Sequence, residues 1–386
     1  MNLLIILSRV PYPLEKGDKL RAYHQIRCLS AHHRITLVAL SHEAVHPDAE
    51  RILSAFCEEV HVLRLNRFTV VVNLLRALIN GLPLQAGYFY SGRNYRRINA
   101  IIAQSKPDHI YCQLLRTAGY VKDVHIPKTL DYMDVFSAGM LRRKEKAPWL
   151  LKPFFRLEYQ RLLNYEATVF DWFNHHTIIS EPDRALIPHK RNHEIVIISN
   201  GVDQEYFTAT KAEKKYQVLF TGNMGYPPNI NAAELLIKQV MPLVRKSFPE
   251  AVAVLAGANP HARVKALADD KTIVTGWVDD IRPWYAASEV FIAPMQIGTG
   301  LQNKLLEAMS MGLPAITSEL ANGALGATPG VQILVGTTAE EFAAHIINLL
   351  NDKQFMQKLA TAGQQYVMDT FSWEGATQKL SDLMVQ

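Results

Sequence analysis

Short apolar runs alternate with longer amphipathic stretches from one end of the chain to the other. Several of these runs consist of Val, Ile and Leu almost without interruption, which is typical of strands buried on both faces of a parallel sheet. In the first half the pattern predicts strands at 3–7, 35–40, 60–63, 109–112, 128–131, 177–180 and 195–198. In the second half it predicts strands at 217–221, 251–256, 272–275, 290–293, 315–317 and 332–335.

The alternation of strands with helical patterns in both halves predicts an α/β protein with two doubly wound domains. A chain of 386 residues that is 48% hydrophobic can bury two cores of ordinary size. Asn200-Gly201 is a turn signal, and a polar, charged stretch separates it from the next apolar run. We therefore expect a first domain at 1–199, a second at 200–370 and a closing amphipathic helix at 371–386.

The chain carries no sequence signal for export or for a bound metal. Its opening run, MNLLIILSRV, lacks a basic leader and a cleavage pattern, so we interpret it as a first strand. No apolar stretch reaches the roughly 18 residues of a membrane span. The three cysteines, Cys28, Cys57 and Cys112, lack the spacing of a disulfide framework or a zinc site. We expect a cytoplasmic protein with no metal and no cofactor, peripheral on the inner face of the membrane if it meets one.

Charge is spread unevenly between the two predicted domains. Residues 1–199 carry 27 Lys and Arg against 18 Asp and Glu, a net charge of +9, whereas the remainder carries −4. Within the basic half, the segment 141–156 combines six basic residues with Trp149, Phe154 and Phe155. That composition suits an anionic membrane surface, and a solvated loop followed by a core helix is the alternative. No DNA- or RNA-binding motif accompanies the charge, so nucleic acid is not an expected partner.

The segment with the clearest chemistry is IGTGLQNKLLEAMSMGLPAI, residues 297–316. A loop is predicted at 296–301 after a strand, and a helix at about 302–311, which Gly312 and Pro314 terminate. The glycines of the loop let the backbone approach a ligand closely. The first amides of the helix and its dipole favour an anion at the same place.

Lys304 and Glu307 stand three residues apart on one face of this predicted helix. A lysine in the first turn opposes the helix dipole unless an anion compensates it. A carboxylate one turn further on can accept hydrogen bonds from the two hydroxyls of a ribose. The layout fits a nucleoside diphosphate, and a surface Lys–Glu pair after an ordinary loop is the alternative interpretation. No Walker loop is present, and no Gly-x-Gly-x-x-Gly motif follows the strand.

Two other loops follow predicted strands in the second half. In LFTGNMGYPPNINAAELL, Gly222 and Asn223 form a tight turn, and Asn229 is predicted to cap the next helix. In VTGWVDDIRPWYAAS, Trp277 could offer an aromatic face to a nucleobase, with core packing as the alternative. Because open α/β sheets bind ligands at the carboxyl ends of their strands, these loops are candidates for one ligand site.

Together these segments resemble the donor-binding half of retaining glycosyltransferases of family 4, which have the GT-B fold. The stretches that carry the resemblance are FTGNMGYPPNINAA, VTGWVDDIRPWYAASEVFIAP and GTGLQNKLLEAMSMGLPAITS, and the Gly-x-Gly…Lys-x-x-Glu part is the most specific. The resemblance extends to SRVPYPLEKGDKLRAYHQI, DYMDVFS, IISEPDR and SNGVDQEYF, so it covers nearly the whole chain. The closest likeness is to bacterial sugar transferases of exopolysaccharide gene clusters.

The resemblance implies two Rossmann-like domains that face each other across a cleft. The domain at 1–199 would bind the acceptor, the domain at 200–370 the nucleotide sugar, and the helix at 371–386 would cross back to the first domain. Matching positions imply a set of donor-binding residues: Gly17, Gly222, Asn223, Trp277, Val278, Gly298, Thr299, Gly300, Leu301, Lys304 and Glu307. They also imply catalytic roles for Lys304, beside the diphosphate, and for Asp134, and acceptor binding by Arg21.

Two positions depart from the family pattern. Typical members carry a glutamate eight residues before the ribose-binding one, where this chain has Thr299, as is usual in the subgroup with a small Gly-x-Gly loop. Typical members also have a basic residue after the Gly-Asn turn, whereas NMGYPPN has none. The diphosphate would then depend on Lys304 alone, or on Arg9 or Arg21 from the other domain.

The sequence therefore predicts a retaining, metal-independent glycosyltransferase that moves a hexose-like sugar from a nucleotide diphosphate donor. The expected acceptor is a saccharide in cell-surface polysaccharide synthesis. We further expect this saccharide to be linked to a lipid. A nucleotide-sugar epimerase of the same fold is one alternative. A non-catalytic protein that binds sugar nucleotides is another, because the donor-sugar acid is missing at Thr299.

Overall fold

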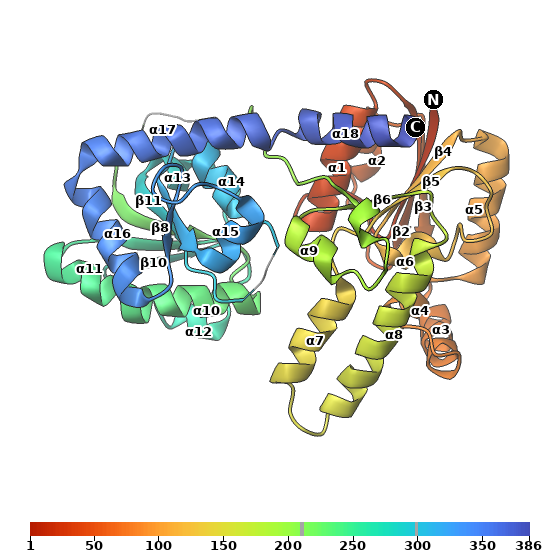
Figure 1. Ribbon diagram of the computed structural model, residues 1–386, viewed down its shortest axis with the longest axis horizontal. Coiled ribbons are helices and arrows are strands. Elements are labelled where there is room, and N and C mark those ends of the chain that lie inside the picture. The colour runs from red at the N-terminus through yellow and green to blue at the C-terminus, as the bar shows by residue number, and fades with distance from the viewer. Residues whose placement is uncertain (209–211, 298–299) are drawn as a thin grey trace. The chain divides into compact units, whose positions relative to one another are not determined.

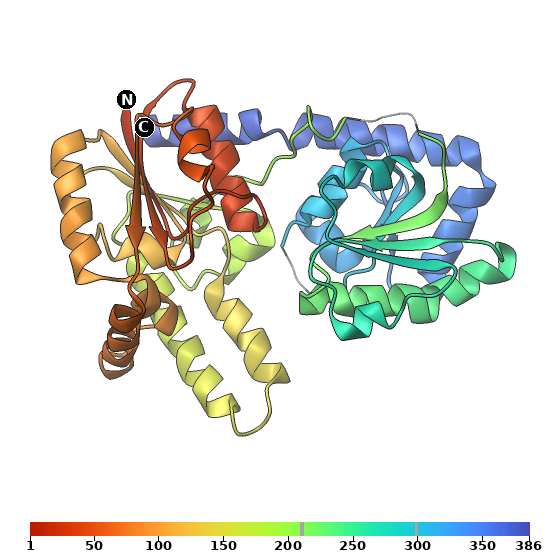
Figure 2. The same cartoon turned by 180° about the vertical axis from the view of Figure 1, so that it is seen from behind.

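The computed structural model describes residues 1–208, 212–297 and 300–386. The chain divides into two compact units. Unit 1 comprises Met1–Ser199 together with Trp373–Gln386, and unit 2 comprises Asn200–Ser372. Figures 1 and 2 show that each unit consists of a layer of strands with helices on both sides.

The described residues of unit 1 form a seven-stranded sheet in the order β3-β2-β1-β4-β5-β6-β7, in which all neighbouring strands are parallel. The central strand β1 is buried on both faces, and its Leu4 lies opposite Thr36 on one side and Ile110 on the other. The strands are β1 (Asn2–Leu7), β2 (Arg34–Ser41), β3 (Glu59–Arg64), β4 (His109–Gln113), β5 (Lys128–Asp131), β6 (His175–Ile178) and β7 (Val196–Ile197). Each overlaps or adjoins a strand predicted from the apolar runs.

The helices of unit 1 connect these strands and cover both faces of the sheet (Figures 1 and 2). They are α1 (Gly17–Leu29), α2 (Ala49–Leu53), α3 (Arg67–Ile79), α4 (Leu84–Phe89), α5 (Gly92–Ser105), α6 (Leu115–Ala118), α7 (Phe136–Lys146), α8 (Lys152–Phe170), α9 (Glu181–Leu186), the 3-10 helix η1 (Asn192–Glu194) and α18 (Trp373–Val385). Within the described residues, no helix has the length and apolarity needed to cross a membrane.

Helix α18 packs against α1 within unit 1. The Trp373 side chain at its start is buried and stacks on the His24 ring, with centroids 4.8 Å apart. At the other end of the contact, His33 Nε2 lies 2.7 Å from Ser381 Oγ. Because an aromatic side chain of this size contributes a large buried area, Trp373 is the main anchor of α18.

The described residues of unit 2 form a six-stranded parallel sheet in the order β10-β9-β8-β11-β12-β13. Counted along the chain this is the order 3-2-1-4-5-6 of dinucleotide-binding sheets, in which ligands bind where the order reverses. In unit 2 that point lies between β8 and β11. The strands are β8 (Tyr216–Thr221), β9 (Ala253–Ala256), β10 (Thr272–Gly276), β11 (Ser288–Ala293), β12 (Ala315–Ser318) and β13 (Leu334–Gly336), and all had been predicted.

Helices α10 and α12 lie along one face of the unit 2 sheet, and α14 and α15 lie along the other (Figures 1 and 2). The full set is α10 (Pro227–Leu235), the π-helix η2 (Leu236–Val240), α11 (Met241–Ser247), α12 (Ala262–Lys265), α13 (Arg282–Ala286), α14 (Asn303–Ser310), α15 (Glu319–Leu325), α16 (Ala339–Asn351) and α17 (Lys353–Thr370).

The predicted cap at Asn229 is wrong. Helix α10 begins at Pro227, two residues earlier, with Tyr226 as the preceding residue. Proline suits the first position of a helix because its missing N–H would be unbonded there in any case. The side chain of Asn229 is therefore free of a capping role and takes part in a different contact, described below.

Candidate functional site

Two helices begin next to each other at the point where the strand order of unit 2 reverses. Strand β8 leads through Gly222 into α10, and β11 leads through a Gly-rich loop into α14. The carboxyl ends of β8 and β11 therefore bring the first turns of α10 and α14 together. Helix N-termini present unbonded backbone N–H groups and a positive dipole end, so this edge of the sheet favours an anion.

Lys304, in the first turn of α14, is held by neutral groups. Its Nζ donates a hydrogen bond of 2.6 Å to Asn229 Oδ1 and a longer one of 3.4 Å to Gln302 Oε1. The sulfur of Met295 lies 3.8 Å from Nζ, and the ammonium lies 5.2 Å from the centroid of the Phe220 ring. Within the described part of the chain, no carboxylate forms an ion pair with this ammonium. The contacts fix the direction of the Lys304 side chain and leave its charge unneutralised.

The electrostatics of Lys304 and Glu307 reflect their burial. Burial lowers the pKa of Lys304 from 10.5 to about 8, while the nearby charge of Glu307 acts in the opposite sense. Burial also raises the pKa of Glu307, and its hydrogen bond from Tyr285 partly offsets that rise. A partly desolvated cation without an ion-pair partner is stabilised by any anion that binds beside it.

Glu307 is fixed by a hydrogen-bonded chain that starts at the end of β8. The fully buried Tyr285 donates its hydroxyl proton to Glu307 Oε2 at 2.9 Å. Since that proton is used, the Thr221 hydroxyl, 2.8 Å away, donates to the Tyr285 oxygen. The chain orients the carboxylate of Glu307 on the same face of α14 as Lys304.

Two glycines allow the strand ends to pack closely beneath these side chains. Gly222 has φ +148°, and a Cβ there would lie 2.8 Å from Asn229 Nδ2. Gly257, after β9, has φ +142°, and a Cβ there would lie 1.9 Å from the Gly222 carbonyl oxygen. Gly222 thus makes room for the Asn229 side chain that supports Lys304. Asn223 completes the support, because its carbonyl oxygen accepts a 2.9 Å hydrogen bond from Asn229 Nδ2.

The remaining donor-binding predictions in unit 2 fall on loops. Gly300 and Leu301 lie in the loop before α14, where the Gly300 carbonyl accepts a 2.8 Å hydrogen bond from Gln302 Nε2. Gly298 and Thr299 lie outside the described residues. After β10, Trp277 is 63% exposed, so its ring is available to a ligand rather than packed in the core. Its neighbour Val278 is half-buried.

Unit 1 also has polar residues at the carboxyl ends of its strands, but the three predicted site residues of this unit differ in accessibility. Asp134 follows β5 and is exposed, and Gly17 begins α1 and is exposed. Arg21, by contrast, has no exposed side-chain surface and forms a 2.6 Å ion pair with the equally buried Asp131. Tyr111 donates a further hydrogen bond to Asp131. Arg21 can therefore affect an acceptor only by holding α1 against the sheet.

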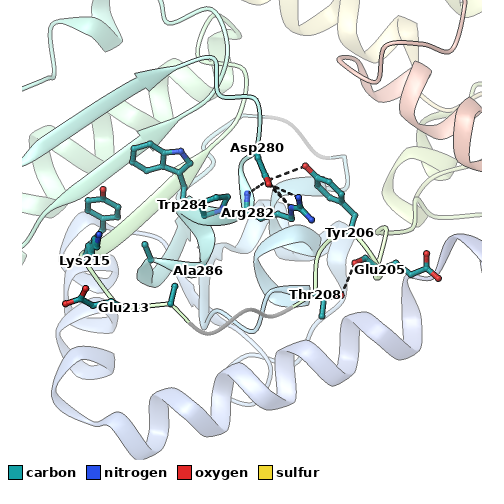
Figure 3. Close-up of a pocket in the computed structure, with 13 residues that line it drawn as sticks. Glu205, Tyr206, Thr208, Glu213, Lys215, Asp280, Arg282, Trp284 and Ala286 are labelled. Carbon is teal, nitrogen blue, oxygen red and sulfur yellow. Dashed lines mark hydrogen bonds and ion pairs between the residues drawn. The ribbon is translucent and has the colours of Figure 1, made fainter. Parts of the chain in front are cut away.

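A hollow of about 800 Å³ in unit 2 does not include Lys304 or Glu307 in its lining. Figure 3 shows its lining, to which Tyr206, Asp280 and Arg282 contribute. The Arg282 guanidinium forms a 2.7 Å ion pair with Asp280 and lies 4.1 Å from the centroid of the Tyr206 ring. Since its main cation is already neutralised, this hollow has a weaker claim to an anionic ligand than the edge at β8 and β11.

The helices and strands that build this edge lie in a segment that matches a family model. Residues 215–352 match the family model for glycosyl transferases group 1. The group 1 region runs from β8 through α16 and contains Lys304, Glu307 and every side chain described above as contacting them. Among the described residues, no cluster of three or more His, Cys, Asp or Glu side chains could hold a metal ion.

Similarity to known proteins extends beyond the group 1 region. The chain is 21% identical over 391 residues to an uncharacterised 44.6 kDa protein in the cps region of Klebsiella pneumoniae, with 96% of each chain covered. Sucrose-phosphate synthase from Thermosynechococcus elongatus has a similar structure, with a TM-score of 0.73, 14% identity and coverage of 99% of this chain and 98% of that one. Anabaena Alr3699/HepE in complex with UDP-glucose gives a TM-score of 0.69 at 15% identity, covering 99% of both chains. The chain has the GT-B fold over its full length.

Sequence reasoning missed several residues that build the site. Tyr285 and Thr221 orient Glu307, and Asn229 supports Lys304, yet none of them was predicted to do so. The signal for Asn229 was present, because Pro227 and Pro228 mark an earlier helix start and leave the asparagine inside the first turn. Nothing in the spacing of Tyr285 distinguishes it from a core aromatic residue.

Proposed function

We propose that this chain is a glycosyltransferase that moves a sugar from a nucleotide diphosphate donor to a saccharide acceptor in cell-surface polysaccharide synthesis. Unit 2 would bind the donor and unit 1 the acceptor. The fuller form of the proposal is a retaining, metal-independent hexosyltransferase of family 4 with a lipid-linked acceptor. The cps-region relative and the UDP-glucose complex of the structural neighbour support the pathway and the donor class, respectively.

The single observation that carries the proposal is the environment of Lys304. This lysine is partly desolvated and is held by an asparagine and a glutamine, and no carboxylate of the described residues lies in bonding distance. Such a lysine is arranged for an anionic ligand. A diphosphate beside it would supply the missing negative charge. As the bond between sugar and diphosphate breaks, charge accumulates on the leaving diphosphate, and Lys304 with the first amides of α14 would stabilise it.

Glu307 would hold the ribose of the donor. Tyr285 donates to Oε2 and so leaves Oε1 to accept hydrogen bonds from ribose hydroxyls. The exposed ring of Trp277 would face the base. Gly298 and Thr299, outside the described residues, and Gly300 stay predicted contacts of the diphosphate and sugar. In unit 1, the exposed carboxylate of Asp134 would act at the reacting end of the acceptor.

A donor panel tests this proposal in two steps. Thermal shift with nucleotide sugars of each base identifies the donor, and incubation of the best donor with saccharide acceptors shows its fate. The proposal expects a new glycoside together with free nucleoside diphosphate. Conversion of the donor sugar without an acceptor would instead identify an epimerase, and binding without turnover in any acceptor mixture would identify a non-catalytic binding protein.

A further inference from the structure

Helix α3 of unit 1 presents large apolar side chains to solvent. Phe68, Val71, Leu75, Leu78, Ile79 and, just after the helix, Leu82 are between 41% and 83% exposed. Their spacing of three and four residues places them along one side of the helix. The other side of α3 already packs inward through Val70, Asn73 and Ala77. An ordinary surface helix has a polar outer face. The apolar outer face of α3 therefore indicates an interaction site.

A second exposed apolar set lies at the turn between α7 and α8. Trp149, Leu150 and Leu151 are 77%, 69% and 50% exposed, and Phe154 and Leu157 in the first turns of α8 are 46% and 49% exposed. Figures 1 and 2 show α7 and α8 as a hairpin that extends beyond the sheet of unit 1, with this turn at its far end. Because the set is at the tip of a projection, it is suited to a broad surface rather than to a narrow groove.

The two apolar sets belong to neighbouring elements. Arg161 of α8 donates a 2.8 Å hydrogen bond to the carbonyl oxygen of Leu78, near the end of α3. The backbone N–H of Leu84, at the start of α4, donates a 2.7 Å hydrogen bond to the buried carboxylate of Glu158 in α8. Both views also show α3 beside α8. We call the two sets together the α3–α8 apolar surface.

The charges around the α3–α8 apolar surface are almost all positive. The segment 66–82 contains two arginines and no acid, and the segment 138–157 contains six basic residues and one acid. Arg67, Arg143 and Arg156 are exposed. A second copy of the chain would bring two positive rims together, which is unfavourable. A negatively charged partner with an apolar interior fits both the charge and the side chains.

We propose that the α3–α8 apolar surface docks unit 1 on an anionic lipid bilayer. The side chains of Trp149, Phe154 and the outer face of α3 enter the interfacial region, where indole and phenyl rings are favoured. Lysine and arginine side chains extend toward the lipid phosphates, as their long stems allow. The proposal goes beyond the proposed transfer reaction and does not depend on it.

Co-sedimentation of the full chain with lipid vesicles tests the docking. The chain should sediment with vesicles that contain phosphatidylglycerol at low salt and much less with pure phosphatidylcholine. Raising the salt should weaken binding, because salt screens the attraction between the basic side chains and the lipid phosphates. The contribution of the buried apolar side chains should remain. A chain that stays in the supernatant with anionic vesicles at low salt contradicts the proposal.

Matched glutamate variants locate the contact. Ile79→Glu and Trp149→Glu each place a charge where the bilayer would be, and both positions are so exposed that the fold should tolerate the change. Each should lower the partition coefficient by about tenfold or more, since a large apolar side chain is lost and a charge is added. The controls, Val331→Glu and Val385→Glu, alter apolar side chains that are 54% and 69% exposed on other elements, and should bind like the wild type. Equal loss in test and control variants would overturn the assignment.

The basic residues are tested by reversing charges. Arg143→Glu combined with Arg156→Glu should weaken binding to anionic vesicles by at least about fivefold for each charge removed. Lys358→Glu combined with Lys379→Glu makes the same change in net charge on exposed lysines of α17 and α18 and should have a much smaller effect. Equal effects of the two pairs would mean that overall charge, not this surface, attracts the lipid.

Sedimentation velocity without lipid distinguishes the bilayer from a second copy. The proposal expects a monomer whose state does not change in Ile79→Glu. A dimer that Ile79→Glu disperses would show that the surface is a subunit interface, and would overturn the proposal. Nucleotide binding measured on the same variants should be unchanged, so failure of the docking and failure of the proposed transferase function give different results.

Discussion

Both units have a buried cation near the carboxyl ends of the strands of a parallel sheet, and the two cations have different partners. In unit 1, Arg21 and Asp131 form a fully buried ion pair at the carboxyl end of β5, closed by further hydrogen bonds from Tyr111 and Thr177. In unit 2, Lys304 lies in the first turn of α14, which follows β11, and among the described residues its hydrogen-bond partners are all neutral. The topology therefore does not decide which edge binds a ligand. What differs is whether the buried charge already has its counter-ion.

The largest effect on stability should come from breaking the buried Arg21–Asp131 ion pair of unit 1. Asp131→Asn leaves the Arg21 guanidinium buried without its counter-charge, so the free energy of unfolding should fall by about 3–5 kcal/mol. Denaturant titration measures this. The control Asp134→Asn changes an exposed carboxylate three residues away and should cost less than about 0.5 kcal/mol. Similar losses in the two variants would show that the pair is not the stabilising feature we describe.

Lys304→Met should produce the next largest effect, on rate rather than on stability. Charge develops on the leaving diphosphate in the transition state, so an ammonium beside it contributes more there than in the bound donor. We expect kcat to fall on the order of 10²-fold, as for loss of one electrostatic stabiliser. Stability should be unchanged or higher, because a desolvated charge is removed. Steady-state kinetics at saturating acceptor and a thermal melt measure both, and a wild-type kcat would refute the leaving-group role.

Glu307→Gln should act mainly on donor binding. Ribose hydroxyls do not change charge during the reaction, so their hydrogen bonds stabilise the bound donor and the transition state alike. Replacing a carboxylate acceptor with an amide should raise the donor KM by about tenfold, with kcat nearly constant. A variant that loses kcat and keeps its KM would place Glu307 at the reacting bond instead of at the ribose.

The smallest effect is a pH dependence that the Lys304 environment predicts. With a pKa of about 8 in the free protein, Lys304 loses its charge as the pH rises through that value. The affinity for a nucleoside diphosphate should therefore fall by about fourfold between pH 7 and 8.5. This fall should be absent in Lys304→Met, whose affinity is lower at both pH values. An identical pH dependence in the two proteins would assign the titration to another group.

The same pKa fixes the sign of a stability change. The pKa of Lys304 is lower in the folded chain than the ordinary value of 10.5, so the unfolded chain binds more protons between about pH 8 and 10.5. The burial penalty of the ammonium is therefore present below pH 8 and is lost as the pH rises through this window. Compared with Lys304→Met, the wild type should gain stability over that range.

The sequence predicted the strands of both units because their apolar runs are long, β-branched and separated by clear helical patterns. Lys304 and Glu307 were predicted because their spacing is local and their chemistry is distinctive. The start of α10 was misplaced because Asn229 has the side chain of a cap, while the two prolines decided the boundary. A local pattern can therefore identify a charged pair without identifying what supports it.

The contacts that make the two buried cations differ could not be predicted from the sequence, because they join residues that lie far apart in the chain. Arg21 meets Asp131 across 110 positions, and Lys304 meets Asn229 across 75. The sequence presents both arginine and lysine as candidates for an anionic or polar ligand. Only their burial and partners show that one charge is satisfied and the other is not. The outer face of α3 was missed for a related reason, because an apolar helix is ordinarily assumed to be buried.

Calorimetric titration with free nucleoside diphosphates tests the central claim most directly, because it needs neither the sugar nor the acceptor. The account predicts that one base gives saturable binding to the wild type. It also predicts that Lys304→Met and Glu307→Gln each weaken this binding by about tenfold or more. The matched controls, Lys358→Met and Glu340→Gln, change exposed residues of unit 2 and should leave the Kd as it is. Wild-type affinity in both site variants would contradict the account and place the nucleotide away from the edge at β8 and β11.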